Sequence, residues 1–393
     1  MSRFAAVAPP TATLHALWPA YLVLVMAFFD NLAVVPLLAP YGRTLGADPA
    51  LTGLIVAAYS ITNLLGNIVA GYALDRWGRR RPLLLSLWGT ALVLSSYAMV
   101  RSAGELLILR AVHGFTISAL TPAAVAAIGD RSPEGRRSLE AGRIGATIGL
   151  TAVAAPPLGG LIGQSWGIQA LFWSLAALMA LSGLVAFLRF PETLDPRERT
   201  SASVSPWSLL RQPGLRWTYV GALGLTLAMG ALTVYLPLTV EELGYRARTS
   251  GLLFGLFALL ALAVMLGLRA RRDALAQQWW RLRGGLLGLA AGLILVGAET
   301  SLAGLLSGMG LFGVGFGFAF PAMTVLVQSY APSRGRGTAV ALFFALYSLG
   351  VILGQTSSGL LLSHGLRPPL LIAPGLGALA LWLTWRDPDR RKP

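Results

Sequence analysis

Residues 71–82 read Gly71-Tyr-Ala-Leu-Asp75-Arg76-Trp-Gly78-Arg79-Arg80-Arg81-Pro82, a charged, glycine-containing stretch between two long apolar runs. Each flanking run, at 50–74 and 82–100, has close to the length of about 20 residues that an α-helix needs to cross a bilayer. Charges are costly inside the hydrocarbon, so a segment this rich in arginine lies at the membrane surface. The stretch therefore predicts a short surface loop that joins two transmembrane helices.

The composition of the whole chain is typical of a membrane protein. Apolar residues make up 55% of the 393 positions, charged residues make up 12%, and the mean hydropathy is +0.67. A surface built from this composition is too apolar for water. Runs of spanning length occur twelve times, at 15–39, 50–74, 82–100, 105–128, 139–163, 168–189, 217–240, 250–268, 284–299, 302–328, 338–363 and 368–385. We therefore expect an all-α integral membrane protein with twelve transmembrane helices.

The two halves of the chain repeat each other. Val35-Pro36-Leu37 returns as Leu236-Pro237-Leu238 and Gly53 as Gly251, both about 200 positions later, which predicts two pseudo-symmetric six-helix halves. A segment rich in proline, serine and charge separates them. The expected order is a cytoplasmic tail (1–13), a first half (14–190), a cytoplasmic linker (191–216), a second half (217–385) and a cytoplasmic tail (386–393).

The net charge of +15 is distributed unevenly along the chain. Most basic residues fall in the termini and in the loops that follow even-numbered spans, and the opposite loops hold Arg43, Arg101, Arg246, Arg248 and Arg367. Because Lys and Arg concentrate on the cytoplasmic side, this pattern predicts an inner-membrane protein with both termini in the cytoplasm. It also accounts for the charge without nucleic acid, through orientation and contact with anionic lipid.

The loop at 71–82 resembles a motif of a known family. The pattern Gly71-x-x-x-Asp75-Arg76-x-Gly78-Arg79-Arg80 is similar to the loop between helices two and three of the major facilitator superfamily, transporters that rock two six-helix halves around a central site. The resemblance implies that Asp75 and Arg79 form a cytoplasmic latch against the N-terminal end of helix eleven, expected near Gly337. Gly71 is expected to admit a neighbouring helix closely. The alternative is that the arginines only set orientation.

Three ionisable residues are predicted to lie within spans and at similar depth. Asp30 is the one carboxylate near the middle of a predicted span, and Arg110 and His113 lie on the fourth span. Intramembrane charges usually face a partner or a water-filled cavity. We expect Asp30 to pair with Arg110 when ionised and to release it when protonated, with His113 sharing the proton. A purely structural role for each of the three remains the alternative.

The segment 105–114 also resembles the superfamily's helix-four motif, in which an arginine is followed three residues later by a polar residue, usually Gln, and then Gly. The resemblance implies a role in proton transfer for Arg110. His113 stands where Gln is usual, so its assignment rests on the chemistry of histidine alone.

The fifth span carries a second resemblance. Pro156, Gly159 and Gly160 match the Gly-Pro-x-x-Gly-Gly signature of the drug:proton antiporter branch, the twelve-helix exporters, with Ala155 in place of its first glycine. Small residues let helices pack closely, and proline frees backbone carbonyls and allows a bend. The resemblance implies efflux, and an ordinary close-packed helix is the alternative.

Polar residues at helical spacing predict the substrate cavity. Tyr59, Asn63 and Asn67 recur every four residues along the second span and therefore share one face. The complete set of candidate substrate-binding residues is Asn31, Tyr59, Asn63, Asn67, Ser118, Thr121, Tyr235, Gln328, Tyr347 and Gln355. Each of them could instead hold helices together. One carboxylate among apolar and aromatic neighbours suits a lipophilic or cationic molecule.

Enzymatic constellations are missing from the sequence. The chain has three histidines (His15, His113, His364), no phosphate-binding Gly-Lys-Ser loop and no His-x-x-x-His metal spacing. There are no cysteines, which excludes disulfides and thiolate metal sites. We expect neither catalysis nor a cofactor.

These observations together predict a secondary active transporter. We expect a monomeric, proton-coupled exporter of small lipophilic or cationic compounds that works by alternating access in the lipid bilayer. A uniporter or symporter of a metabolite or lipid would share the fold. A transport-inactive receptor or scaffold is an alternative of a different class.

Overall fold

A computed structural model describes residues 10–131, 137–193, 206–268, 275–298, 301–332 and 336–385. This part of the chain is helical and contains no strand. The helices are α1 (Pro10–Thr44), α2 (Pro49–Trp77), α3 (Arg80–Tyr97), α4 (Ala103–Ile117), α5 (Leu120–Arg131), α6 (Arg137–Trp166), α7 (Ile168–Arg189), α8 (Pro206–Arg211), α9 (Pro213–Glu242), α10 (Ala247–Leu268), α11 (Leu275–Ala298), α12 (Leu302–Tyr330), α13 (Arg336–Ser363) and α14 (Pro368–Trp385).

Twelve helical spans of the described chain confirm the predicted all-α membrane fold. Ten stretches are long and apolar enough to cross a membrane, and α4 and α5 together make one of them. The 18-residue α3 and the shorter apolar stretch Pro368–Leu383 of α14 complete the set. The predicted tails fall largely outside the described residues, although α1 already begins at Pro10. Of the predicted linker, residues 191–193 and 206–216 are described, the latter with α8 and the first turn of α9.

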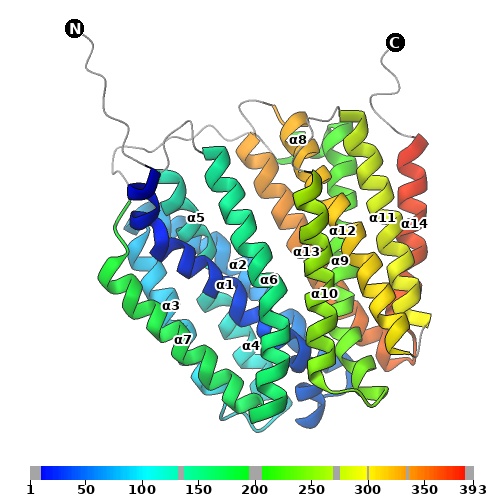
Figure 1. The fold of residues 1–393 in the computed structure, drawn as a ribbon, viewed down its shortest axis with the longest axis horizontal. Coiled ribbons are helices and arrows are strands. Elements are labelled where there is room, and N and C mark those ends of the chain that lie inside the picture. Colours follow the sequence, from blue (N-terminus) through cyan, green and yellow to red (C-terminus); the bar gives the residue numbers. More distant parts are fainter. Residues whose placement is uncertain are drawn as a thin grey trace.

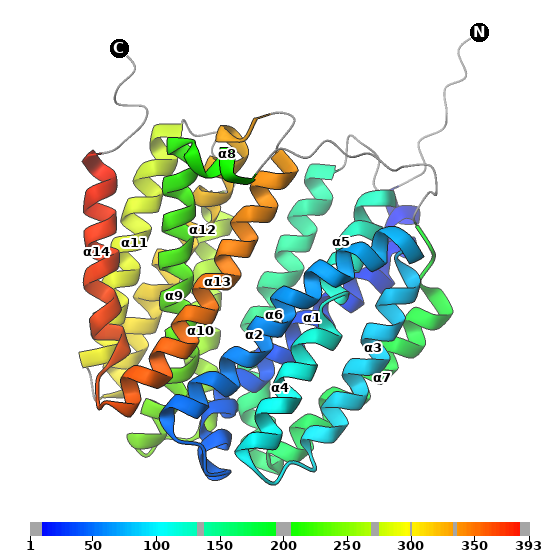
Figure 2. The ribbon, with the colours of Figure 1, turned by 180° about the vertical axis from the view of Figure 1, so that it is seen from behind.

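The helices form two groups, each around its own core. Buried apolar residues of α1–α7 make one cluster, joined by Val234 and Leu238 from α9, and those of α8–α14 make the other. Figure 2 shows the two groups side by side, α1–α7 in one and α9–α14 in the other. Leu85 and Leu92 on α3 are exposed by 68% and 70%. Exposed leucines on a membrane span face lipid, so this side of α3 lies against the hydrocarbon.

The N-terminal end of α1 and the C-terminal end of α14 lie at one end of the bundle (Figure 1), which we call the terminal end. The halves press together at the opposite end. A Cβ built on Gly53 of α2 would lie 2.7 Å from Gly359 Cα of α13, and one on Gly251 of α10 would lie 2.4 Å from the Pro156 carbonyl oxygen of α6. Only glycine permits backbones this close. Arg43 on α1 also meets Glu242 on α9 at 2.9 Å. We call these contacts the opposite-end seal.

The fourth span is broken in its middle, between α4 and α5. Proline at position 122 has no N–H to bond the carbonyl of Ser118 four residues earlier, so the regular hydrogen-bond pattern of the helix is interrupted at this point. Ser118 instead donates from its hydroxyl to the Phe115 carbonyl oxygen at 2.7 Å. The break lies where the span borders the space between the halves, and it turns Ser118 and Thr121 toward that space.

Candidate functional site

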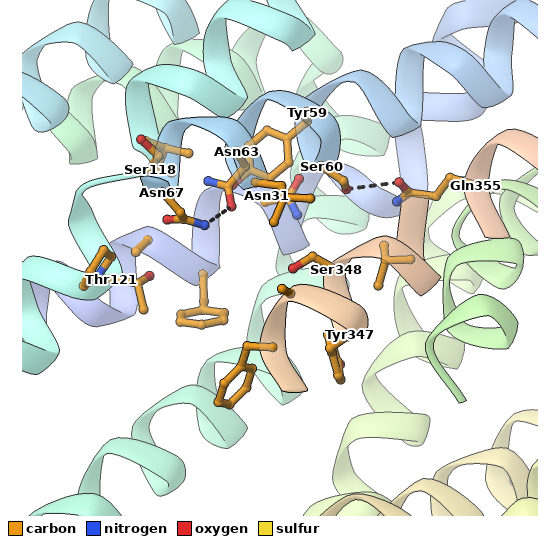
Figure 3. A pocket seen from close by; sticks show the side chains of 18 of the residues that line it. Asn31, Tyr59, Ser60, Asn63, Asn67, Ser118, Thr121, Tyr347, Ser348 and Gln355 are labelled. Atoms are coloured by element: carbon orange, nitrogen blue, oxygen red, sulfur yellow. Dashed lines mark hydrogen bonds between the residues drawn. The ribbon is translucent and has the colours of Figure 1, made fainter. Parts of the chain in front are cut away.

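A cavity of about 950 Å³ lies between the two halves, lined by α1, α2, α4 and α5 from one half and by α9 and α13 from the other. Figure 3 shows Asn31, Tyr59, Ser60, Asn63 and Asn67 of the first half opposite Tyr347, Ser348 and Gln355 of the second. Its lining continues toward the terminal end, to Ile68 on α2 and Thr338 on α13. The opposite-end seal closes its other side.

Eight of the predicted substrate-binding residues line this cavity, and two do not. The eight are Asn31, Tyr59, Asn63, Asn67, Ser118, Thr121, Tyr347 and Gln355. Tyr235 is 5% exposed and packs inside the core of the second half, and Gln328 is exposed on α12 near the terminal end. Residue type alone could not separate these two from the others, because their placement depends on how α9 and α12 are rotated in the bundle.

The predicted carboxylate is buried behind the cavity wall. Asp30 is 0% exposed and its Oδ2 lies 2.8 Å from His113 Nε2, with His113 1% exposed. The Tyr97 hydroxyl lies 3.4 Å from His113 Nδ1, and the Tyr59 ring meets the imidazole edge to face at 5.1 Å. Neither Asp30 nor His113 belongs to the cavity lining. The arrangement is a buried carboxylate–imidazole pair in contact with two tyrosines.

The predicted pairing of Asp30 with Arg110 differs from the structure. His113 lies one helical turn beyond Arg110 on α4 and reaches the carboxylate, so Arg110 bonds elsewhere. Its Nη2 donates to Asn31 Oδ1 at 3.3 Å, and its guanidinium lies 4.6 Å from the centre of the Tyr59 ring. Arg110 is 3% exposed and lines the cavity, and among the described residues its Nε has no hydrogen-bond partner.

A chain of side-chain hydrogen bonds crosses the cavity at its closed end. Ser60 donates to Gln355 Oε1 at 3.0 Å, and Gln355 Nε2 donates to Thr233 Oγ1 at 3.3 Å. Ser60 belongs to the first half, and the other two belong to the second. Figure 3 shows the first of these bonds as a dashed line between the halves. The link is therefore a polar tie between the halves inside the cavity itself.

The loop between α2 and α3 is held by a carboxylate from beyond α7. Glu192 accepts the backbone N–H groups of Arg79 at 2.8 Å and Arg80 at 3.1 Å, at the N-terminal end of α3. A carboxylate is favourable at that end of a helix. Gly78 has φ +84°, and a Cβ there would lie 2.3 Å from Glu192 Oε2. These two facts together explain the glycine at position 78.

The remaining latch residues lie at the terminal end, away from the opposite-end seal. Arg79 Nε meets Asp130 of α5 at 3.3 Å, within the first half, and Arg76 donates to the Tyr72 hydroxyl at 2.7 Å. A Cβ on Gly71 would meet no atom of the described residues within 4 Å, so the expected close approach of a helix is not seen there in the described part of the chain. The side chains of Asp75 and of Arg336, which precedes Gly337, are not among those that the structure describes. The latch between Asp75 and helix eleven stays a prediction.

The two glycines of the antiporter-like motif have different neighbours. A Cβ on Gly159 would lie 1.9 Å from the Ala33 carbonyl oxygen of α1, within the first half. A Cβ on Gly160 would lie 2.9 Å from the Ala247 carbonyl oxygen of α10, in the second half. Pro156, one turn earlier, touches Gly251 of α10. The motif therefore packs α6 against its own half on one side and contributes to the opposite-end seal on the other.

One buried cation of the second half was missed. The predicted ninth span begins at 284, whereas α11 begins at Leu275 and carries Arg283 inside it, 2% exposed. Arg283 Nη2 donates to the Leu383 carbonyl oxygen of α14 at 2.8 Å, and its guanidinium lies 5.2 Å from the centre of the Trp280 ring. The sequence places the start of this span at 284 because the arginines just before that position lower the local hydropathy. Arg283 lies outside the cavity lining.

Comparison with known sequences decides the family. A profile described as Major Facilitator Superfamily matches residues 20–355 and 280–393. The chain belongs to the major facilitator superfamily. It is therefore a multi-pass membrane transporter that handles small-molecule substrates in the bilayer, as the loop at 71–82 predicted.

Relatives within the superfamily match nearly the whole chain at low identity. The inner membrane transport protein YajR of Escherichia coli is 26% identical over 388 residues, covering 96% of this chain and 84% of that protein. Multidrug resistance protein 2 of Bacillus subtilis is 21% identical over 376 residues, covering 92% and 93%. The crystal structure of the human organic anion transporter MFSD10 superposes with a TM-score of 0.71 at 21% identity, covering 96% and 99%.

Three residues of this superfamily member that contribute to the site were missed from the sequence. Ser60 lies three residues before Asn63 and so shares its helix face, a signal that the search for steps of four passed over. Glu192 and Asp130 reach the α2–α3 loop from distant parts of the chain. No local pattern marks contacts of that kind.

Removing the carboxylate of Glu192 is expected to loosen the α2–α3 loop. In Glu192→Ala, the amides of Arg79 and Arg80 lose their acceptor, so their hydrogen exchange should become several-fold faster. Mass spectrometry of deuterated peptides covering 77–83 measures the effect. Glu105→Ala, which removes an acceptor from the Arg101 amide instead, is the matched control and should leave that peptide unchanged. Equal exchange in Glu192→Ala and the unmodified protein would contradict the clamp.

Proposed function

We propose that the protein is a proton-coupled exporter of small, mainly apolar organic compounds that works as a monomer by alternating access. The observation that carries the proposal is the Asp30–His113 pair at 2.8 Å, buried directly behind a substrate-sized cavity. A carboxylate and an imidazole in contact can share, accept and release a proton without a second buried charge. Tyr59 and Arg110 connect this pair to the cavity, because both line it. The Tyr59 ring contacts the His113 ring, and the Arg110 guanidinium lies over the Tyr59 ring.

The proposed cycle starts from the conformation described above. With both termini in the cytoplasm of an inner-membrane protein, as the basic loops favour, the terminal end is the cytoplasmic end. The cavity then receives substrate from inside the cell while the opposite-end seal excludes the exterior. Export requires that the seal and the Ser60–Gln355 bond open while the terminal end closes. The predicted latch at Asp75 would hold the terminal end in that second state.

Two observations favour export over uptake. The Pro156–Gly160 segment resembles the antiporter signature and contributes to the seal on the proposed external side. Multidrug resistance protein 2 of Bacillus subtilis is among the relatives that match over most of the chain. A proton that enters from outside and leaves inside would then drive the substrate in the other direction.

Reconstitution into liposomes tests the proposal. Purified protein is assayed for transport of fluorescent lipophilic compounds with and without an imposed pH gradient, while an internal pH dye records proton movement. We expect substrate movement against its own gradient together with an opposite proton flux. Transport that ignores the gradient would support a uniporter, and parallel movement of both would support a symporter.

A further inference from the structure

We infer that the cavity selects organic anions, molecules with a carboxylate or similar acid group on an apolar aromatic body, and that Arg110 is their counter-charge. The inference rests on the proposed function in one respect, since it takes the cavity to be the transport site. It departs from the cationic substrate that a single intramembrane carboxylate suggests. The position of the two charges relative to the cavity is the reason.

Among the described residues that line the cavity, Arg110 is the one with a formal charge. Asp30 is 0% exposed, lies outside the lining and is already bonded to His113. A cationic ligand would therefore meet a like charge at the wall and no accessible carboxylate. An anionic ligand would meet an opposite charge at a site of low dielectric constant, where such an attraction is strong.

Arg110 also has donors to spare. A guanidinium has five N–H donors, and the Nε of Arg110 is buried without a hydrogen-bond partner in the described structure. Its bond to Asn31 Oδ1 is 3.3 Å long, and it is made to a neutral amide rather than to an acid. A carboxylate of a ligand would offer the shorter bonds, of roughly 2.7–2.9 Å, that a charged pair forms. Because Asn31 turns its oxygen to Arg110, its amide nitrogen is left to donate to the same ligand.

The rest of the cavity suits an apolar aromatic body. Phe28 and Tyr59 in the first half and Phe344 and Tyr347 in the second line it, and their rings offer faces and edges for stacking. Its volume of about 950 Å³ is sufficient for a molecule of several rings. The acid group would lie at the α1–α4 wall and the body would extend toward α13.

Binding of three probes with one skeleton tests the inference. The probes are 2-naphthoate, 2-naphthamide and 2-naphthylmethylammonium, titrated calorimetrically into the full-length protein in lipid nanodiscs, with empty nanodiscs subtracted. We expect naphthoate to bind at least about tenfold more tightly than the amide, which corresponds to about 1.4 kcal/mol, and the ammonium to bind most weakly. In Arg110→Gln the advantage of naphthoate over the amide should vanish, and in Arg110→Lys part of it should remain. Arg101→Gln, an exposed arginine in the α3–α4 loop, is the control and should keep the preference.

A second variant guards against misfolding of Arg110→Gln. Asn31→Asp leaves Arg110 in place but gives it a carboxylate partner, so the naphthoate preference should be lost there too. Equal binding of the three probes, tighter binding of the ammonium, or a naphthoate preference that persists in both variants would overturn the inference. A naphthoate preference without coupled proton flux in liposomes would leave the anion site standing and reject the proposed function. Coupled transport of amines alone would support the proposed function and reject the anion site.

Discussion

Replacing Asp30 with asparagine is expected to reduce substrate-dependent proton flux to the level of protein-free liposomes. Asparagine has nearly the shape of aspartate and can still form a hydrogen bond with His113, but its amide does not take up or release a proton at the pH of the assay. The pair then keeps its packing and loses the ability to take up and release a proton. The measurement is the change of internal pH on addition of substrate, together with the melting temperature of the purified variant. The melting temperature should fall little, because the buried contact is preserved.

The matched control is Glu105→Gln, which neutralises an exposed carboxylate at the start of α4. It should transport and couple as the unmodified protein does. Coupled proton flux that survives in Asp30→Asn would remove Asp30 from the proposed mechanism. If flux is lost but the variant also melts far below the control, His113→Gln supplies the independent test, because it leaves the carboxylate and removes its partner.

Inserting a large side chain at Gly53 is expected to stop transport by holding the opposite end open. In Gly53→Leu the new side chain would occupy the space of the Gly359 backbone, where even a Cβ comes within 2.7 Å. Overpacking of this kind costs roughly 1–3 kcal/mol. The contact joins the two halves, so overpacking there destabilises the conformation in which the opposite end is closed and leaves each half intact. About 1.4 kcal/mol changes the ratio of the two conformations tenfold.

Accessibility from the two sides measures this shift. The chain has no cysteine, so a single Ser348→Cys in the cavity wall reports cleanly with a membrane-impermeant maleimide. Labelling from the terminal end should fall and labelling from the opposite end should rise, so that the ratio of the two labelling rates changes by about tenfold. Gly104→Leu, at the start of α4 where a Cβ meets nothing within 4 Å, is the control. Unchanged labelling in Gly53→Leu would show that the Gly53–Gly359 contact does not set the balance of conformations.

Much of the fold could be predicted because the bilayer imposes a length and a polarity on each span. The twelve apolar runs and the repeat of Val35-Pro36-Leu37 at 236–238 follow from those constraints. Helix ends were predicted less well, as at α11, because arginines near a membrane surface are compatible with both loop and helix.

The site was predicted in its residue types more than in its pairings. Depth along the spans placed Asp30, Arg110 and His113 together, and helix faces placed Asn63 and Asn67 in the cavity. Rotation about the helix axes decides which side chain meets which, and the sequence carries no signal for it. For that reason the partner of Asp30 was expected to be Arg110, and the structure has His113.

The opposite-end seal has a consequence for the environment to which the protein responds. Its contacts are backbone against backbone at glycines, joined by one ion pair whose side chains are 30% and 59% exposed. Exposed ion pairs contribute little and are screened by salt. The stability of the seal itself should thus hardly vary with ionic strength. It should depend instead on how tightly the surrounding lipids press the helices together, so that acyl-chain length and lateral pressure would act on the seal where salt does not.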